Sequence, residues 1–344
     1  MEKYKVVGID LANNVFQVCG LNQAGKVAFN RKVTRAKLAE FIQQLSPTML
    51  AMESCGSANY WARRFEALGH EIRIIPAQHV KPFMRGNKND ANDALAICEA
   101  ALRPDVRPVP IKTQAHQDLQ MLHRIRQRHM RNATAVANQA RALLRENGIV
   151  VPVSVNKLLK AIPGLLEDGD NGLTPLSRQV LNTLQQELHY ERQCVEEFER
   201  LLKAHLADNE TYEHLQTVPG YGPIISSALL AAVGNASQFK RSRQMSAWVG
   251  LTPRHTGTAG KITLLDTSKK GDRYLRALLI HGARTVVMWS KDKDDPLSLW
   301  VNRIIERRGR NKAIVALANK CVRIAWAIIT RGEVYRTSAL TPSL

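Results

Sequence analysis

Five short apolar segments in the first 75 residues restrict the fold more than any other feature of the chain. Two segments with helical spacing, residues 36–45 and 57–68, separate the third, fourth and fifth of them. Three consecutive strands followed by alternating helices and strands are typical of a layered α/β domain with a mixed sheet. We therefore predict strands at residues 4–10, 15–21, 26–33, 49–53 and 71–75.

Acidic residues stand at the ends of two of these strands and at the start of a predicted helix. Asp10 ends the first strand, and Glu53 ends a later strand that we expect beside it. Asp90 and Asp93 are three residues apart, so a helix beginning near Asn89 puts both carboxylates on one face. Taken alone, this pair is most simply explained by a favourable interaction with the helix dipole.

The four carboxylates suggest a metal site when they are considered together. In an RNase H-like layout acids at these places converge, and converging carboxylates repel one another unless a divalent cation neutralises them. Oxygen ligands favour Mg²⁺ or Mn²⁺ over zinc. A strand ending in Gly-Ile-Asp10 also occurs in actin-like sugar kinases, but the sequence contains no glycine-rich phosphate loop to complete that interpretation.

The charge of the chain favours a polyanionic partner. The net charge is +19, from 49 Lys and Arg against 30 Asp and Glu. Residues 240–344 hold 21 basic and 7 acidic residues, which gives +14 of the +19, whereas residues 165–210 hold 4 basic and 10 acidic residues. This asymmetry predicts separate modules, with nucleic acid bound mainly by the C-terminal part.

An anionic membrane is the weaker explanation of the charge. We see no signal peptide and no apolar run of the roughly 18 residues that a membrane span needs. The five cysteines are scattered and include no Cys-x-x-Cys pair, which favours a reduced, cytoplasmic chain without a zinc site.

Two long helices are predicted in the middle of the chain, at residues 112–147 and 175–206, with a loop at 164–174. The first helix is basic, and this charge fits phosphate contacts or a solvated face equally well. Its histidines are expected to be structural or surface residues. The second helix has near-heptad apolar spacing, which suits an antiparallel hairpin or an intersubunit coiled coil. The predicted domains are therefore 1–110, 111–210 and 211–344.

The C-terminal part is predicted to be mainly α-helical and contains two candidate DNA-binding features. In Pro219-Gly-Tyr-Gly222, between two helical stretches, Gly220 and Gly222 suit a helix-hairpin-helix whose backbone N–H groups approach a phosphate. An ordinary tight turn is the alternative.

The second feature is Ser268, at a junction between a loop and a helix. A serine at such a place often caps the helix, but Asp272 can do the same. Helix capping also does not require the four cations that surround Ser268, which instead suit a phosphodiester beside the hydroxyl. They are Lys269, Lys270, Arg273 and Arg276. Together with Gly220, Gly222 and Arg254 they are the predicted nucleic-acid-binding residues.

Six motifs, in order along nearly the whole chain, resemble the IS110 family of insertion-sequence transposases. They are Gly-Ile-Asp10, Glu53-Ser-Cys-Gly56, Asp90-Ala-Asn-Asp93, Pro219-Gly-Tyr-Gly222, Gly250-Leu-Thr-Pro-Arg254 and Ser268-Lys-Lys-Gly-Asp-Arg-Tyr-Leu-Arg276. The segment from Tyr274 to Arg284 is similar to the IS1111 subgroup.

This resemblance implies a RuvC-like N-terminal domain and a C-terminal transposase domain. Asp10, Glu53, Asp90 and Asp93 then form an acidic quartet that binds Mg²⁺, and Ser268 is the catalytic serine. The family is also associated with a structured non-coding guide RNA that pairs with donor and target DNA. The implied reaction is strand exchange through a phosphoserine link to DNA.

Two other functions are weighed against this one. A RuvC-like junction nuclease would cut by water hydrolysis and leave free ends, with Ser268 as a cap. A non-enzymatic nucleic-acid-binding scaffold would use the acids only as helix caps and surface charge. Because Ser268 is far from the quartet in sequence, we also expect a homo-oligomer, a dimer or tetramer, whose active site is composed between subunits.

Overall fold

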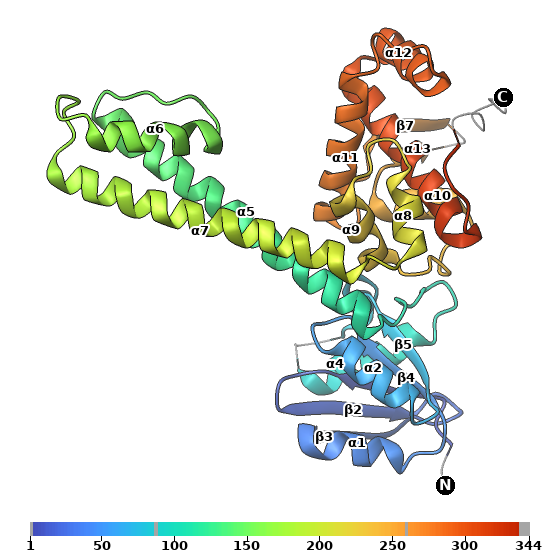
Figure 1. The fold of residues 1–344 in the computed structure, drawn as a ribbon. Helices are drawn as coiled ribbons and strands as arrows, with labels where there is room; N and C mark the ends of the chain where they lie inside the picture. Colours follow the sequence, from blue (N-terminus) through green and yellow to red (C-terminus); the bar gives the residue numbers. More distant parts are fainter. Residues whose placement is uncertain (1–2, 86–88, 259–260, 337–344) are drawn as a thin grey trace. The chain divides into compact units, whose positions relative to one another are not determined.

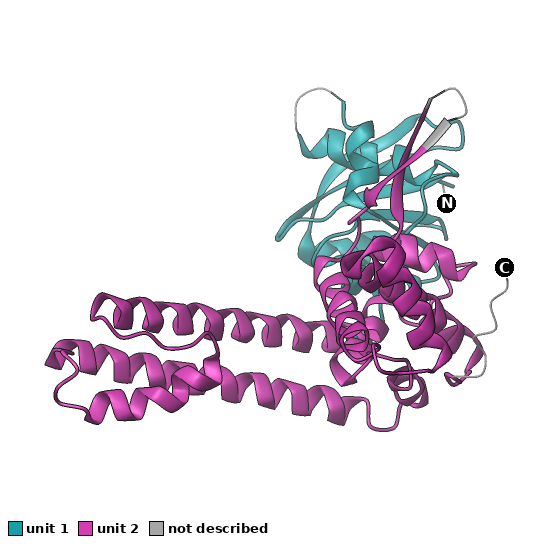
Figure 2. Ribbon diagram, turned by 90° about the horizontal axis from the view of Figure 1, so that it is seen from above, with its two compact units in different colours: residues 1–114 teal, residues 115–344 magenta. Residues whose placement is uncertain are grey.

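The computed structural model describes residues 3–85, 89–258 and 261–336. The chain divides into two compact units, Met1–Gln114 and Ala115–Leu344, which Figure 2 shows in different colours. Each unit is described by itself below. The division into three domains stays a prediction.

A five-stranded mixed sheet forms the centre of the first unit, as predicted. The strand order is β3-β2-β1-β4-β5, in which β1, β2 and β3 pair antiparallel while β4 pairs parallel with both β1 and β5. The strands are β1 (Val6–Asp10), β2 (Val15–Leu21), β3 (Val27–Thr34), β4 (Met49–Glu53) and β5 (Glu71–Ile75).

Helices cover both faces of this sheet because the side chains of each central strand alternate between two cores. Val7 and Ile9 of β1 pack in one core with the helix residues Leu38 and Phe65, whereas Val6 packs in the other core with α4. The helices of this unit are α1 (Arg35–Gln43), α2 (Ala58–Glu66), α3 (Ala77–Val80), the 3-10 helix η1 (Lys81–Phe83) and α4 (Asp90–Ala101).

Gly8 allows α4 to lie close against β1. A Cβ atom at this position would be 2.5 Å from the carbonyl oxygen of Ala94 and 2.6 Å from the sulfur of Cys98. The helix begins where it was predicted, because the Asn89 side chain accepts hydrogen bonds from the backbone N–H groups of Ala91 and Asn92. The close approach and the cap together fix the first turn of α4 beside β1.

Two long helices and a short one form a helical arm at the start of the second unit (Figure 1). They are α5 (Gln114–Glu146), α6 (Val155–Glu167) and α7 (Pro175–His205). The two long helices match the prediction. Helix α6 was not predicted, and its last turns occupy part of the expected loop at 164–174.

Buried polar contacts hold α5 and α7 antiparallel within one chain. His129 Nδ1 lies 2.6 Å from the Glu191 carboxylate, and Arg126 Nε donates to Glu199 at 2.8 Å. His123 is also buried, between the hydroxyls of Ser227 and Tyr274. These contacts give His123 and His129 structural roles. The intersubunit coiled coil stays a prediction.

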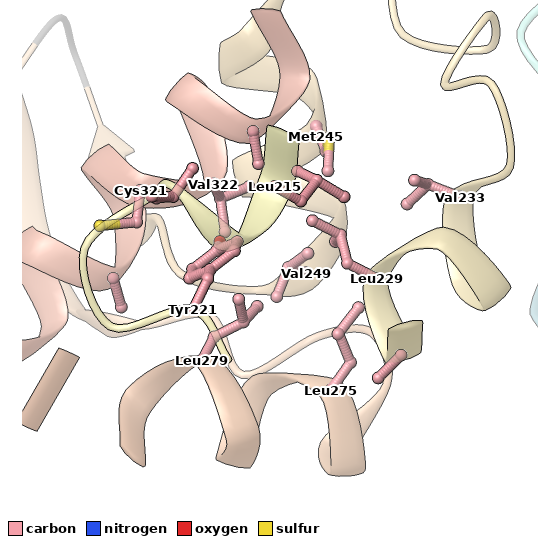
Figure 3. Close-up of a cluster of buried hydrophobic side chains, with 14 of the residues drawn as sticks. Leu215, Tyr221, Leu229, Val233, Met245, Val249, Leu275, Leu279, Cys321 and Val322 are labelled. Atoms are coloured by element: carbon pink, nitrogen blue, oxygen red, sulfur yellow. The ribbon is translucent and has the colours of Figure 1, made fainter. Parts of the chain in front are cut away.

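The rest of the second unit is mainly helical around one apolar core. Figure 3 shows Tyr221 within this core, with Leu279 and Val322 among its neighbours. The elements are α8 (Glu210–Gln216), α9 (Pro223–Val233), α10 (Ser242–Val249), β6 (Pro253–Thr258), β7 (Lys261–Thr267), α11 (Arg273–Met288), α12 (Pro296–Arg308) and α13 (Arg310–Arg331).

Helix α13 corrects one expectation about apolar runs. By length and composition it could cross a membrane. Its apolar side chains, including Leu317 and Val322, instead pack in the core of the second unit. This burial is the behaviour of a core helix, so α13 is weak support for a membrane function.

Candidate active site

The register of the sheet brings Asp10 and Glu53 to the same edge. The parallel pairing of β1 with β4 places Ile9 opposite Met52, so the next residues along the two strands are Asp10 and Glu53. Carboxyl ends of parallel strands meet at one edge, which is the common position of a functional site in α/β sheets. The predicted adjacency of these two strands is confirmed.

Asp93 lies close enough to Glu53 to affect its ionisation. Burial, and then repulsion by the negative charge of Asp93, raise the pKa of the Glu53 carboxyl above its usual value. The Oδ1 atom of Asp93 is buried and has no hydrogen-bond partner among the residues that the structure describes. Glu53 and Asp93 are therefore two carboxylates whose mutual repulsion no described cation relieves.

Asp90 stands apart from this pair. Its side chain is 67% exposed and lies 4.0 Å from the ammonium group of Lys32. Both Asp90 and Asp93 are in the first turn of α4, where an acid interacts well with the helix dipole. Asp90 therefore takes part in an exposed ion pair with Lys32.

We call Asp10, Glu53 and Asp93 the carboxylate edge. Their oxygen atoms are ligands that suit a divalent cation, although these side chains do not converge on one point. Within residues 3–85, 89–258 and 261–336, no three Asp, Glu, His or Cys side chains converge tightly enough to hold a metal ion. A buried, unpartnered carboxylate oxygen beside a second carboxylate is the donor set that a hard cation satisfies. Assignment of all four acids as metal ligands stays a prediction.

Ser268 lies at the base of the β6–β7 hairpin, directly after β7. Its backbone N–H donates to the carbonyl of Thr252 at 2.8 Å. Its hydroxyl oxygen is buried and has no hydrogen-bond partner among the described residues. The cap of α11 is Asp272, which accepts a hydrogen bond from Leu275 N–H at 2.7 Å. Ser268 is therefore not the cap of this helix.

The backbone around Ser268 is held in an unusual conformation. Lys269 has a φ of 52°, which is rare for a residue with a side chain. Gly250 has a φ of 84° and approaches Lys270 so closely that a Cβ there would be 1.9 Å from the Lys270 carbonyl oxygen. Strained backbone of this kind persists only where the surrounding structure enforces it, and it concentrates at functional sites.

The predicted cations around Ser268 differ in their surroundings. Arg276 uses its Nη1 atom to donate to the carbonyl oxygens of Val249 and Lys270, at 3.3 and 3.1 Å, and so binds the loop to α10. Arg254, Lys269, Lys270 and Arg273 are exposed. Arg276 thus has a structural contact that sequence reasoning did not predict, while the exposed cations are free to meet phosphates.

The turn between α8 and α9 contains the two predicted glycines in different environments. A Cβ at Gly220 would be 2.5 Å from the carbonyl oxygen of Gly282 in α11, so this glycine serves helix packing. Gly222 caps α9 and faces open space, where its backbone could approach a phosphate. The helix-hairpin-helix assignment stays a prediction.

A large groove beside Ser268 was missed by sequence reasoning. We call it the cationic groove. It has a volume of about 1260 Å³, and Thr267, Trp300 and four cations of α12 and α13 line it. The cations are Arg303, Lys312, Lys320 and Arg323. The basic cluster at residues 303–312 signalled part of it, but nothing in the sequence shows that α12 and α13 face β7.

The mixed five-stranded sheet followed by a mainly helical region is consistent with a DEDD nuclease-like transposase domain, and comparison with known proteins shows this class. A DEDD-type family model described as "Transposase" matches residues 7–148, and one described as "Transposase IS116/IS110/IS902 family" matches residues 212–296. A DEDD-type domain indicates dependence on a divalent metal.

Full-length relatives define the family. The chain is 43% identical to the transposase for insertion sequence element IS1111A of Coxiella burnetii, over 98% of this chain and 93% of that protein. It is 38% identical to the transposase for IS1328 of Yersinia enterocolitica, over 97% and 99%. A pilin gene-inverting protein of Moraxella bovis is 22% identical, over 95% and 96%. The chain belongs to the IS110 family of insertion-sequence transposases and is a DNA transposase.

Proposed function

We propose that this transposase exchanges DNA strands through a phosphoserine link at Ser268, with Asp10, Glu53, Asp90 and Asp93 as metal ligands. The observation that carries the proposal is the Ser268 hydroxyl, which is buried and has no hydrogen-bond partner among the described residues. It lies within a constrained loop beside exposed cations. Because this hydroxyl caps no helix and bonds no described neighbour, its contacts give it no structural role, which supports a chemical one.

The carboxylate edge supplies the second part of the reaction. Glu53 and Asp93 repel each other at the end of the sheet, and Asp10 stands beside Glu53 in the register. These acids would hold Mg²⁺, or Mn²⁺, which stabilises charge on the attacking and leaving oxygens at phosphorus. Asp90 completes the set once its side chain leaves Lys32.

The proposed step balances as a transesterification. The Ser268 hydroxyl loses its proton to a base, and its oxygen forms a bond to phosphorus. The bond from phosphorus to one deoxyribose oxygen breaks, and that oxygen takes up a proton. The reverse attack by a hydroxyl of another DNA strand then restores the serine. Each exchange keeps the number of phosphoester bonds constant, so no external energy source is needed.

The proposed partners are donor DNA, target DNA and a structured guide RNA, with the protein acting in the cytoplasm as a homo-oligomer. The net charge of +19 supports polyanionic partners in general. The RNA rests on the family resemblance alone. Transcripts of the DNA that flanks the gene, tested for binding to the protein, would show whether such an RNA exists.

The products of the reaction distinguish this function from a junction nuclease. The protein is incubated with donor and target DNA, Mg²⁺ and the flanking transcript, and the DNA ends are analysed. We expect joined strands and few free ends. Free ends without joining, at the same rate in Ser268→Ala, would support water hydrolysis and refute the serine mechanism.

A further inference from the structure

The cationic groove carries positive charge that no described neighbour neutralises. Four cations line it, against one lining acid, Asp266. Within residues 3–85, 89–258 and 261–336, none of the four forms an ion pair with a carboxylate within 4.0 Å. Cations clustered in a concave site attract an anion strongly, and several in a row suit a chain of phosphates.

Apolar side chains also line the groove. Leu265, Leu299 and Val315 line the groove together with the half-buried Trp300. The ammonium group of Lys320 lies 4.5 Å from the centre of the Trp300 ring, a cation–π contact that holds the indole in place. Burial, and repulsion by Arg323, lower the pKa of Lys320.

A groove that combines cations, apolar side chains and an aromatic ring favours an unpaired strand over a duplex. An unpaired strand presents both phosphates and the flat faces of its bases, and such strands bind where cations flank an aromatic stacking platform. A duplex hides the faces of its bases, so the apolar side chains and the tryptophan would add little to its affinity. The volume of about 1260 Å³ also exceeds the roughly 300 to 1,000 Å³ of small-molecule sites.

The groove ends beside the candidate nucleophile. Thr267 lines the groove, and Ser268 is the next residue. A strand lying along the cations would therefore lie next to the segment that carries the serine. That strand is DNA, because DNA is what the proposed serine attacks.

We propose that the cationic groove holds an unpaired segment of the DNA strand that is to be joined, with a base stacked on Trp300 and phosphates on Arg303, Lys312 and Arg323. The proposal rests on the proposed function in one respect, which is that the bound strand is the one attacked by Ser268. The groove itself is defined by residues outside both parts of the candidate active site.

Binding can be tested without catalysis. Full-length protein carrying Ser268→Ala is titrated, in EDTA, into a short labelled single-stranded DNA, its duplex and an RNA of the same sequence, and fluorescence anisotropy is measured. We expect single-stranded DNA to bind most tightly. Adding Lys312→Gln and Arg323→Gln should weaken its binding at least tenfold. The slope of the logarithm of the association constant against the logarithm of the salt concentration should become smaller by about 1.4. Each phosphate contact on a single strand contributes about 0.7 to this slope.

A matched control removes the same charge elsewhere. Lys157 and Lys160 are exposed on α6 and do not line the groove. Lys157→Gln with Lys160→Gln should leave binding of single-stranded DNA within twofold of the parent. An equal loss in both pairs of variants would show that only net charge matters and would overturn the groove as a site.

Trp300 provides a test independent of charge. Trp300→Leu should weaken single-strand binding about 5- to 150-fold, the usual contribution of one stacked base, whereas Trp300→Phe keeps a stacking surface and should lose much less. Equal losses in the two variants, or none in either, would overturn the stacking role.

The binding profile separates this inference from the proposed function. Tighter binding of the RNA, lost on the same substitutions, would assign the groove to RNA and overturn the DNA proposal. Unchanged binding in the groove variants would overturn the groove while leaving a phosphoserine at Ser268 intact. Conversely, absence of the phosphoserine would refute the nucleophile but not the single-strand site.

Discussion

The carboxylate edge of the first unit and the loop around Ser268 in the second unit, here called the serine junction, are held in place by different kinds of structure. Asp10 and Glu53 owe their position to the pairing of two buried strands, and Asp93 to a capped helix that packs closely on Gly8. Ser268 is positioned by a short, strained loop at the base of an exposed hairpin. Regular structure holds the acids, whereas the close packing of Gly250 against Lys270 holds the loop that carries the serine.

The two regions also have opposite electrostatics. Carboxylates repel each other at the edge of the sheet, and this repulsion is relieved when a cation binds. Exposed lysines and arginines surround the serine, and their charge is neutralised when a phosphate binds. The charge of one region thus suits a cation, and the charge of the other suits an anion such as a phosphate.

The largest effect is expected from Gly250→Ala. The new Cβ would be 1.9 Å from the Lys270 carbonyl oxygen, on a residue with a φ of 84°, so the loop that carries Ser268 must move. We expect a loss of about 4 kcal/mol in the unfolding free energy of the second unit and no strand joining. Denaturant unfolding and the joining assay measure these.

Gly309→Ala is the control for Gly250→Ala. Gly309 has a similar φ of 83°, but no atom lies within 4 Å of its ideal Cβ position. Gly309→Ala should lower the free energy of unfolding by only about 1 kcal/mol and should retain strand joining. If both variants behaved alike, the close contact at Gly250 would not be what holds the serine junction.

A smaller loss is expected from Gly8→Ala in the carboxylate edge. Its Cβ would be 2.5 Å from the Ala94 carbonyl oxygen and would push α4 away from β1. We expect about 3 kcal/mol of destabilisation, as in an overpacked core. Gly56→Ala, which has open space around it, should cost almost nothing. Wild-type stability in Gly8→Ala would disprove the close approach.

Metal addition should stabilise the first unit. When the Mg²⁺ concentration is a hundred times its dissociation constant, the free energy of unfolding should rise by about 2.7 kcal/mol. Asp10→Asn and Asp93→Asn should each reduce this gain, which thermal unfolding with and without Mg²⁺ would measure. Ser268→Ala should keep it in full. An undiminished shift in both aspartate variants would place the metal elsewhere.

The smallest effect concerns pH. Burial and Asp93 raise the pKa of Glu53, so the folded protein holds this proton more tightly than the unfolded chain. Without metal, the contribution of Glu53 to stability is therefore most favourable at acid pH and falls as the pH rises above about 4.5, through the raised pKa of Glu53. Asp93→Asn should bring the pKa of Glu53, followed by carbon NMR, closer to normal. An unchanged pKa would mean that Asp93 does not act on Glu53.

The sequence revealed most of the carboxylate edge because its signals are regular. Buried runs ending in Asp10 and Glu53 mark strands, and Asn89 before an acidic turn marks a helix start. The mixed sheet follows from the change from three consecutive strands to alternating helices and strands. The pairing of β1 with β4 was therefore predictable, although the exposure of Asp90 beside Lys32 was not.

The serine junction was less predictable because it depends on contacts between distant residues. The β6–β7 hairpin was missed, since Leu264 and Leu265 are adjacent and 72% and 42% exposed, which breaks the alternation of a half-buried strand. The crowding of Gly250 against Lys270 appears only when the loop is folded. The proline inside α6, Pro163, similarly obscured that helix.

The most direct test of the account is the chemical identity of a protein–DNA adduct. Wild-type protein is incubated with donor DNA, guide RNA and Mg²⁺, denatured, digested with nuclease and protease, and analysed by mass spectrometry. We predict a nucleotide on the peptide that contains Ser268, absent from Ser268→Ala and strongly reduced in Asp10→Asn. An adduct on another residue, or strand joining by Ser268→Ala, would contradict the account.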